Sequence, residues 1–354
     1  MQKAVFIYYS CALALGAVVA AAPAFAVTDP ASYSITKTVP LGAPDRWDYA
    51  YYDATSHSVY VAHGSELTIV DAGEGKVTGS VKPVEGGTHG TAILSALGKG
   101  YTDDGDKGVA VEFDLKTHEI SKTVPADQDA DGIFYDAHSA HVFVIDSDPG
   151  KITVVDPATD KVVATVDAGG KLEFGVSGDD GSVYINGAEK NEIVKINSDK
   201  NQVEAHWPMP GCESPRGLAL DKKNQRLFAS CKNSKLVVTD AGSGKQVAVL
   251  DIGKGSDAVV FDAARQRIFS SNFDGTLSVV SQKDADTYEV LPPVKTALGA
   301  RTMAEDPETG RIFLVTGDYT ENEKAAPTDF RKRYALKPGS AKLLILDPVT
   351  AGAQ

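Results

Sequence analysis

Polar and charged side chains recur in this 354-residue chain at a fixed distance before a series of aromatic residues. Carboxylates and imidazoles at such positions can bind a divalent cation, and arginines can bind anionic groups. Acidic, imidazole and arginine side chains together suit a metal ion or a small zwitterionic or carboxylated ligand. Twelve residues before the aromatic residue stand Asp48, His89, Asp131, Arg216, Asp257 and Arg301, and Phe174 stands ten residues before Tyr184.

The aromatic residues belong to a repeat that returns every 41 to 44 residues, and this repeat must position the polar side chains. An aspartate opens six of the seven copies, as at Asp53 and Asp136, and the copy that ends at Tyr101 lacks it. A period near 40 with alternating apolar strands is typical of a propeller blade. The sequence therefore predicts an all-β fold, a seven-bladed β-propeller of four-stranded antiparallel blades.

The two ends of the chain are expected to close the ring. The last repeat has only three strands, the third near residues 342–346, whereas residues 33–39 form an orphan strand with β-branched alternation. Pairing this N-terminal strand with the last blade removes two exposed strand edges. We therefore predict one propeller domain over residues 27–354; a disordered N-terminal arm is the alternative.

In a propeller, the segment entering each first strand and the loop between the second and third strands lie on one face, around the channel mouth. Ligand-binding residues are expected to gather there from several blades. The alternative is a solvated polar funnel, in which these side chains only cap backbone amides. The predicted ligand-binding residues are Asp48, His63, His89, Asp131, Arg216, Asp257 and Arg301.

One acidic stretch suggests a cation site. Asp127, Asp129, Asp131 and Gly132 form a D-x-D-x-D-G run, but His138 stands where an EF-hand loop carries its last carboxylate. From Thr102 to Asp148, ten Asp and two Glu stand against three Lys, a balance of −9. A bound Ca²⁺ or another divalent cation would relieve this charge, and hydrated acidic loops are the alternative. Asp104 and Asp146 are further candidate ligands in this sector.

The phrases Val59-Tyr-Val-Ala-His63, Leu227-Phe-Ala-Ser-Cys231 and Val142-Phe-Val-Ile-Asp146 resemble the YVTN repeat. The chain from residue 27 onward resembles bacterial YncE-like seven-bladed propellers. The resemblance implies an exported propeller with a binding or unassigned role. DNA binding has been attached to part of that group, and lactonases and amine-dehydrogenase subunits share related blades. Because the motif is structural, the resemblance transfers no catalytic residue to this chain.

The first 26 residues are typical of a secretory signal. Lys3 supplies the positive charge, residues 4–22 the apolar run, and Ala24-Phe25-Ala26 a cleavage site after Ala26. We therefore expect a periplasmic or secreted protein with no membrane span after cleavage; a retained membrane anchor is the alternative. In an oxidising compartment Cys212 and Cys231 are expected to form a disulfide.

A long loop over residues 317–340 interrupts the seventh repeat on the mouth face and can reach over the channel. It carries Phe330-Arg331-Lys332-Arg333-Tyr334, a basic and aromatic cluster that can bind an anionic ligand or single-stranded DNA. The alternative is a solvated loop attracted to the acidic sector. The net charge of −13 disfavours nucleic acids and anionic membranes as partners.

These observations favour an exported, monomeric binding or interaction protein that engages a small molecule or a protein partner through its mouth face. The chain has no G-x-S-x-G, H-E-x-x-H, P-loop or Rossmann motif, so the sequence does not decide whether it is an enzyme. The first alternative is a metal-dependent hydrolase of the lactonase kind that uses Asp48, His89 and Asp131. Single-stranded DNA binding is the second alternative.

Overall fold

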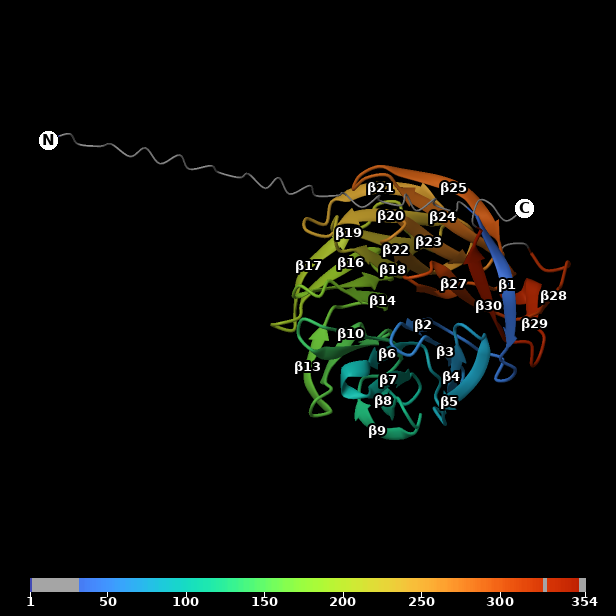
Figure 1. The fold of residues 1–354 in the computed structure, drawn as a ribbon, viewed down its shortest axis with the longest axis horizontal. Coiled ribbons are helices and arrows are strands. Elements are labelled where there is room, and N and C mark those ends of the chain that lie inside the picture. Colours follow the sequence, from blue (N-terminus) through green and yellow to red (C-terminus); the bar gives the residue numbers. More distant parts are fainter. Residues whose placement is uncertain (2–31, 327–329, 350–354) are drawn as a thin grey trace.

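The computed structural model describes residue 1, residues 32–326 and residues 330–349. Within this part, the strands form seven four-stranded antiparallel sheets arranged as a ring, which confirms the predicted all-β propeller (Figure 1). The predicted signal sequence lies outside the described residues. No helix in the described part is long and apolar enough to cross a membrane.

The first six blades follow one another along the chain, each with its first strand innermost. Blade 1 contains β2 (Ala50–Asp53), β3 (Ser58–His63), β4 (Glu66–Asp71) and β5 (Lys76–Val81), and blade 2 contains β6 (Thr91–Leu94), β7 (Lys99–Asp104), β8 (Val109–Asp114) and β9 (Ile120–Pro125), with the 3-10 turn η1 (Ser95–Leu97) after β6. Blade 3 contains β10 (Ala130–Asp136), β11 (His141–Asp146), β12 (Lys151–Asp156) and β13 (Lys161–Asp167).

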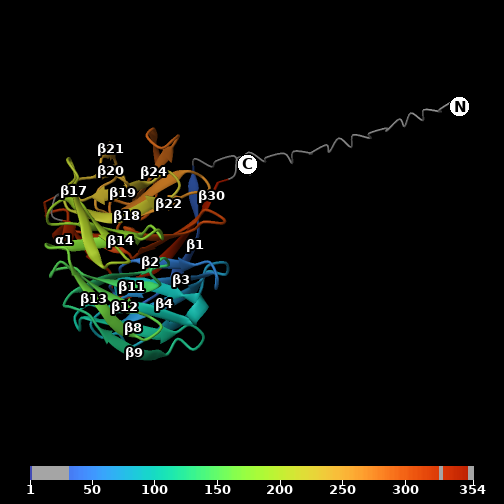
Figure 2. The same cartoon turned by 90° about the vertical axis from the view of Figure 1, so that its left-hand side faces the viewer.

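Blade 4 contains β14 (Leu172–Ser177), β15 (Ser182–Gly187), β16 (Glu192–Asn197) and β17 (Gln202–Pro208), and blade 5 contains β18 (Pro215–Asp221), β19 (Arg226–Cys231), β20 (Lys235–Asp240) and β21 (Gln246–Asp251). Blade 6 contains β22 (Ser256–Asp262), β23 (Arg267–Asn272), β24 (Thr276–Gln282) and β25 (Tyr288–Lys295). Figure 2 shows strands of blades 3 and 4 side by side, and their inner strands are in contact.

Blade 7 combines both ends of the chain, in the order β26 (Thr302–Asp306), β27 (Arg311–Thr316), β30 (Lys342–Pro348) and β1 (Tyr33–Pro40). The register of β1 against β30 runs from Tyr33 opposite Pro348 to Pro40 opposite Lys342. The predicted closure of the ring by the N-terminal strand is therefore confirmed. Because β1 completes this sheet, β30 has a hydrogen-bonded neighbour on each side.

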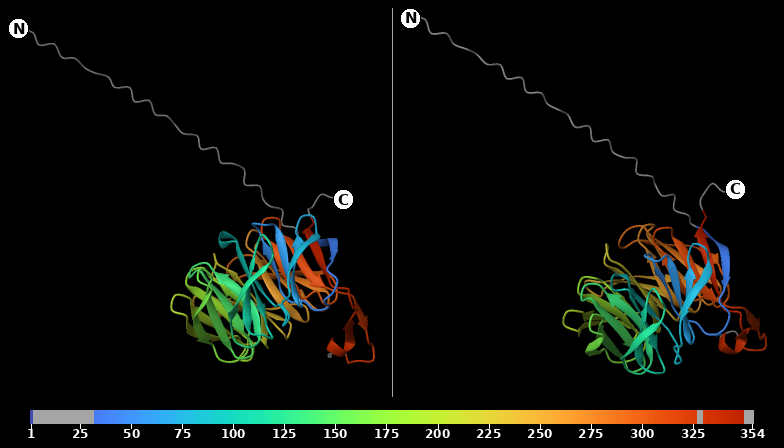
Figure 3. Two further views of the ribbon diagram at one scale, coloured as in Figure 1. Left: turned by 90° about the horizontal axis from the view of Figure 1, so that it is seen from below. Right: turned by 60° about the horizontal axis from the view of Figure 1, so that its bottom comes forward.

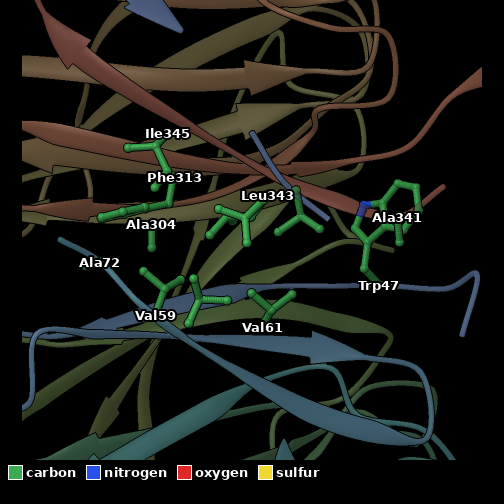
Figure 4. Close-up of a cluster of buried hydrophobic side chains, with 12 residues drawn as sticks. Trp47, Val59, Val61, Ala72, Ala304, Phe313, Ala341, Leu343 and Ile345 are labelled. Carbon is green, nitrogen blue, oxygen red and sulfur yellow. The ribbon is translucent and has the colours of Figure 1, made fainter. Parts of the chain in front are cut away.

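An apolar cluster holds blade 7 against blade 1 (Figure 4). Phe313 on β27 and Leu343 on β30 pack with Val59 and Val61 on β3, and all four side chains are buried. Val39 of β1 belongs to the same cluster. The seam where the chain ends meet is thus packed as a continuous core.

The repeated aromatic residues have a structural role in all seven blades, and the repeated aspartates have one in five of them. The second-strand aromatic residues Tyr60, Tyr101, Phe143, Tyr184, Phe228, Phe269 and Phe313 are all at most 2% exposed, so they fill the cores of and between the blades. The repeated aspartates close the turn after the first strand: Asp53, Asp136, Asp221, Asp262 and Asp306 accept hydrogen bonds from backbone amides two or three residues later. Neither set is free to bind a ligand.

The long insertion of blade 7 forms a small unit of its own. Its strands β28 (Tyr319–Glu321) and β29 (Tyr334–Leu336) pair, and the short helix α1 (Phe330–Arg333) precedes β29. Figure 3 shows this unit projecting from the body of the ring. At its base, the rings of Tyr319 and Tyr334 lie 5.7 and 6.0 Å from that of Phe273 in blade 6.

Candidate functional site

Each of the seven blades brings one charged or ionisable side chain to one end of the channel, at the start of its innermost strand or one or two residues before it. Backbone hydrogen bonds fix neighbouring entry segments to each other: Tyr49 N donates to the His89 carbonyl at 3.1 Å, and Ala258 N donates to the Arg301 carbonyl at 3.1 Å. We call these seven side chains the mouth ring. Its members, from blade 1 to blade 7, are Asp48, His89, Asp131, Glu173, Arg216, Asp257 and Arg301.

Glu173 is the ring member that the sequence spacing missed. The aligned position in blade 4 was Phe174, but Glu173 pairs with Arg216 and faces the charges of Asp131 and Asp257. Burial raises the pKa of Glu173 to about 7. The entry segment of blade 4 is shorter than the others, so counting back from Tyr184 leads to Phe174 and not to Glu173. The acidic residue beside Phe174 is the sequence feature that could have indicated the ring member.

His89 is held rigidly by a buried carboxylate from its own blade. Its Nδ1 lies 2.8 Å from Asp103 Oδ1, and Asp103 also accepts hydrogen bonds from the backbone amides of His89 and Gly90 at 2.8 and 2.7 Å. Asp103 is fully buried and His89 is 5% exposed. The proton on Nδ1 is thereby directed to Asp103, and Nε2 faces the mouth.

Asp48, His89 and Asp131 converge. One ligand atom from each lies within 4.8 Å of the others. Among the described His, Cys, Asp and Glu residues, these three form the group whose possible metal-binding atoms come this close together. His89 Nε2 lies 3.8 Å from Asp131 Oδ1. Within the described residues, the Asp48 carboxylate has neither a hydrogen bond nor an ion pair. These are the three residues that the sequence suggested for a hydrolase.

The acids in this group repel one another. Burial, followed by the charges of Asp257 and Asp131, holds the pKa of Asp48 well above its usual range. Burial likewise raises the pKa of Asp131 to about 6, although His89 opposes this. A half-buried carboxylate beside two other acids is costly when ionised, so a bound positive charge would stabilise it.

The exposed side chain of Arg46 sits on the free nitrogen of His89, with Nη2 2.8 Å from Nε2. A guanidinium only donates, so this contact requires a neutral imidazole with its proton on Nδ1. Burial lowers the pKa of His89, but Asp103, Asp131 and Asp48 outweigh it and raise the pKa to about 10. The contact with Arg46 and the imidazolium are therefore two different states of His89, and protonation must release Arg46.

The two arginines of the ring are not free to bind an anionic group, although the sequence suggested that they could. Arg301 Nε lies 3.2 Å from Asp257 Oδ2, and Arg216 forms an ion pair with Glu173. Each arginine is thus neutralised by an acid of the preceding blade, which also raises the pKa of Arg301. The unpaired charge of the ring lies on the side of Asp48.

An aromatic contact crosses the channel below the ring. Tyr49 of blade 1 meets Phe174 of blade 4 with ring centroids 4.5 Å apart, and the Tyr49 hydroxyl donates to the Asp257 carbonyl at 3.2 Å. A cavity of about 520 Å³ continues past this contact, lined by the inner strands of all seven blades. Its lining includes exposed Asp179 and Lys222 from the strand ends away from the ring, so the cavity opens on the opposite face.

The D-x-D-x-D-G carboxylates do not converge. Asp127 binds Lys151 Nζ at 2.7 Å and Asp129 accepts a hydrogen bond from Asp148 N at 3.1 Å, whereas Asp131 faces His89. The three carboxylates of the D-x-D-x-D-G run therefore contact different partners and do not surround one ion. Asp131 alone joins the group at the mouth.

The remaining candidate ligands serve the loops between the second and third strands. Asp104 accepts hydrogen bonds from Gly86 N and Lys107 N, and Asp146 accepts them from Asp127 N and Thr153 Oγ1. His63 is buried against Thr68, with Nδ1 2.9 Å from Oγ1, and burial lowers its pKa. The structure places these three side chains in loop-stabilising contacts and not in the ring.

The disulfide between Cys212 and Cys231 is present, with the two Cα atoms 5.4 Å apart, as predicted. It ties the entry of blade 5 to the end of β19, next to Arg216. The basic cluster of the insertion is partly engaged: Arg333 Nε donates to Glu321 Oε1 at 2.8 Å, and Tyr334 packs with Phe273. Gly339 N also donates to Asp45 Oδ1 at 2.6 Å, which ties the insertion to the entry of blade 1.

Fold and ring together define the class: a seven-bladed β-propeller with a charged channel mouth. No family model matches the chain, and no curated protein matches its sequence. The chain is similar to a chain of hydrazine synthase from Kuenenia stuttgartiensis, with a TM-score of 0.65, 13% identity, and coverage of 75% of this chain and 91% of that one.

A chain in a crystal structure of the mitotic checkpoint complex is also similar, with a TM-score of 0.69 and 13% identity over 96% of this chain and 98% of that one. At such identity these likenesses show the fold alone. They agree with the propeller architecture and leave the chemistry of the mouth ring to the residues of this chain.

Proposed function

We propose that this protein is a binding propeller that engages a small molecule, or a charged group of a partner, at its mouth ring. The observation that carries the proposal is the Asp48 carboxylate, which is half-buried, faces Asp131 and Asp257, and has no partner among the described residues. The two arginines of the ring are already paired. The group that complements this ring is therefore cationic, such as an amine or a metal ion.

The expected cost of the unpaired carboxylate supports this proposal. Sites that bind charged ligands commonly sacrifice stability for binding, and relieving the strain stabilises the unliganded protein by about 0.5–2 kcal/mol. Because the folded-state pKa of Asp48 lies above its unfolded value, the unfolded chain releases this proton first as pH rises. The carboxylate thus destabilises the native state above the usual Asp pKa, and this effect disappears in acid.

Asp48→Asn is therefore expected to raise the unfolding free energy by about 0.5–2 kcal/mol at pH 7, with the gain vanishing toward pH 3. The same change is expected to abolish stabilisation by cationic ligands. A bound ligand at one hundred times its Kd stabilises the native state by about 2.7 kcal/mol. Thermal unfolding with putrescine, choline and free lysine, in the presence of EDTA, measures both effects.

Asp251→Asn is the matched control, because Asp251 lies in an outer strand with its side chain 84% exposed. It should change neither the baseline stability nor the response to ligands. A response to amines that survives in Asp48→Asn would remove the mouth ring as the binding site. An Asp48→Asn protein less stable than the parent at pH 7 would show that the carboxylate has a structural partner.

We also propose that the protein is exported and is a YncE-like member of the YVTN-repeat propellers. The leader-like residues 1–26 support export, and the Cys212–Cys231 disulfide suits an oxidising compartment. The repeat phrases around the second strands support the family. Single-stranded DNA binding stays a weaker proposal, because Arg333 and Tyr334 of the basic cluster already contact Glu321 and Phe273.

A metal-dependent hydrolase of the lactonase kind is a second candidate function, favoured by the convergence of Asp48, His89 and Asp131. One nitrogen and two carboxylate oxygens within 4.8 Å fit a divalent cation, which would supply polarisation of a substrate carbonyl when bound. Glu173 belongs to the blade after that of Asp131 and has a pKa of about 7, which suits a residue that accepts a proton from water near neutral pH.

If this candidate is correct, hydrolysis of a lactone panel with Mn²⁺, Zn²⁺ or Ca²⁺ should cease with EDTA and in His89→Ala. Glu173→Gln should lower kcat by about 10²–10⁴-fold, the contribution of a general base. Glu189→Gln, an exposed glutamate of the same blade, should not change the rate. Absence of turnover above the buffer rate with all three ions would exclude lactone hydrolysis at this site.

A further inference from the structure

The imidazole of His89 has the arrangement that prepares a histidine to bind a metal ion. Its Nδ1 is bound to the fully buried Asp103 at 2.8 Å, which leaves Nε2 as the ligand atom. A histidine that ligates a metal usually donates its other ring N–H to such a carboxylate, which fixes the tautomer and the ring orientation. The backbone amides of His89 and Gly90 hold Asp103 in turn.

The ring of His89 is also fixed by steric contact. A Cβ added at Gly105 would lie 2.6 Å from His89 Cε1 and 3.2 Å from Nδ1, so the imidazole packs directly on the glycine backbone. The glycine leaves the space in which the ring lies, and a larger residue would push the ring out. Nε2 is therefore presented at a defined position between Asp48 and Asp131.

Two further oxygen ligands stand ready at this position. Asp48 has no partner among the described residues, and the ion pair of Asp131 within this part of the chain is the distant contact of 3.8 Å with His89 Nε2. The three candidate ligand atoms lie within 4.8 Å of one another. Tetrahedral coordination with bonds of about 2.1 Å places ligand atoms about 3.4 Å apart. A contraction of at most about 1.4 Å, the difference between 4.8 Å and 3.4 Å, would therefore complete a three-ligand site.

When His89 is neutral, a cationic group of the protein occupies its coordinating position. Arg46 Nη2 lies 2.8 Å from Nε2, on the lone pair that a metal ion would use. Its guanidinium rests against Gly87, where a Cβ would lie 3.4 Å from Nη1, and the arginine is exposed on its solvent side. An exposed side chain can leave this position without disturbing the core.

We propose that Asp48, His89 and Asp131 bind a divalent transition cation such as Zn²⁺ or Mn²⁺, and that Arg46 guards the site until the cation displaces it. This inference rests on the proposed role of the mouth ring as a binding surface. The imidazole nitrogen favours these ions over Ca²⁺, which takes six to eight oxygen ligands in proteins. Three protein ligands leave an open position for water or for a ligand at the mouth.

The experiment is isothermal titration calorimetry of the metal-free protein with Zn²⁺, Mn²⁺ and Ca²⁺. Zn²⁺ is expected to bind to one site, with Ca²⁺ at least about tenfold weaker. Arg46→Ala should bind Zn²⁺ about tenfold or more tightly than the parent, because its side chain no longer competes for Nε2. Asp103→Asn should weaken binding by about 10–100-fold, as loss of an outer carboxylate does.

Lys107→Ala is the matched control for Arg46→Ala. Lys107 is an exposed cation on the same face, paired with Glu85 and not with His89. Its removal should leave Zn²⁺ affinity unchanged to within about twofold. A gain in both variants would indicate a general charge effect and would overturn the guarding role of Arg46.

His89→Ala decides whether the site exists. Equal Zn²⁺ binding by the parent and by His89→Ala, or no binding by either the parent or Arg46→Ala, would overturn the metal site. Circular dichroism of His89→Ala shows whether a loss of binding comes from the missing imidazole or from unfolding of the protein. Because the amine titrations are performed in EDTA, they test the proposed binding function independently of any metal. The metal site can therefore be disproved while amine binding is confirmed, and amine binding can be disproved while the metal site is confirmed.

Discussion

Removing the N-terminal strand is expected to abolish the cooperative fold. A chain that begins at Leu41 lacks β1, so β30 becomes an exposed edge, and the buried side chains of Tyr33 and Val39 are lost. Burial of each such side chain contributes about 1.5–3 kcal/mol, before the backbone hydrogen bonds of β1 are counted. The total is comparable to the whole stability of a domain, about 5–15 kcal/mol.

Circular dichroism during heating and gel filtration are the measurements. We expect the truncated chain to show no sharp transition and to elute as aggregates, because an open ring exposes a flat strand edge. A chain that begins at Ser32 is the control and should behave as the full chain does. Adding a synthetic peptide of residues 32–41 should restore a transition. A truncated chain that melts within about 5 °C of the control would show that the other blades hold the ring closed.

The architecture could be predicted because the same physical requirement recurs in every repeat. Each second strand needs a large buried side chain, as at Phe143 and Phe228, and most first turns need an acceptor for two backbone amides, as at Asp221. These requirements act within about ten residues of sequence. The closure by residues 33–39 followed from counting strands, because a blade with three strands leaves an edge unpaired.

The mouth ring could be predicted only in part. Fixed spacing located Asp48, His89 and Asp131, since the entry segments of the first three blades have equal length. It missed Glu173, because the entry of blade 4 is shorter. It also treated Arg216 as a free charge, although a residue 43 positions away neutralises it. Pairing across blades depends on side-chain reach in three dimensions, which no local pattern records.

Arg46 and Asp103 are two further residues of the site that the repeat spacing could not identify. Neither occupies a repeat position that marked it for the ring: Arg46 lies in the segment between β1 and β2, and Asp103 lies on the second strand of blade 2. Both contact His89, from opposite sides of one imidazole. The chemical character of that imidazole is set by these two contacts, so the site must be understood as a group around His89.

Asp103→Ala is expected to be among the most destabilising single substitutions in the chain. The carboxylate is fully buried and accepts hydrogen bonds from His89 N, His89 Nδ1 and Gly90 N at 2.7–2.8 Å. Alanine leaves these three donors without their acceptor. Breaking a buried charged pair by removing one partner costs about 3–5 kcal/mol.

Urea denaturation of Asp103→Ala, Asp103→Asn and Asp106→Ala measures this cost. Asn keeps one acceptor oxygen but turns an amide toward a donor, so its loss should be intermediate. Asp106 is exposed in the turn that follows the strand of Asp103, and its substitution should cost less than about 0.5 kcal/mol. A loss below about 1 kcal/mol in Asp103→Ala would mean that water replaces the carboxylate. In that case His89 would be free to rotate, and its Nε2 would lose the fixed position on which the metal site depends.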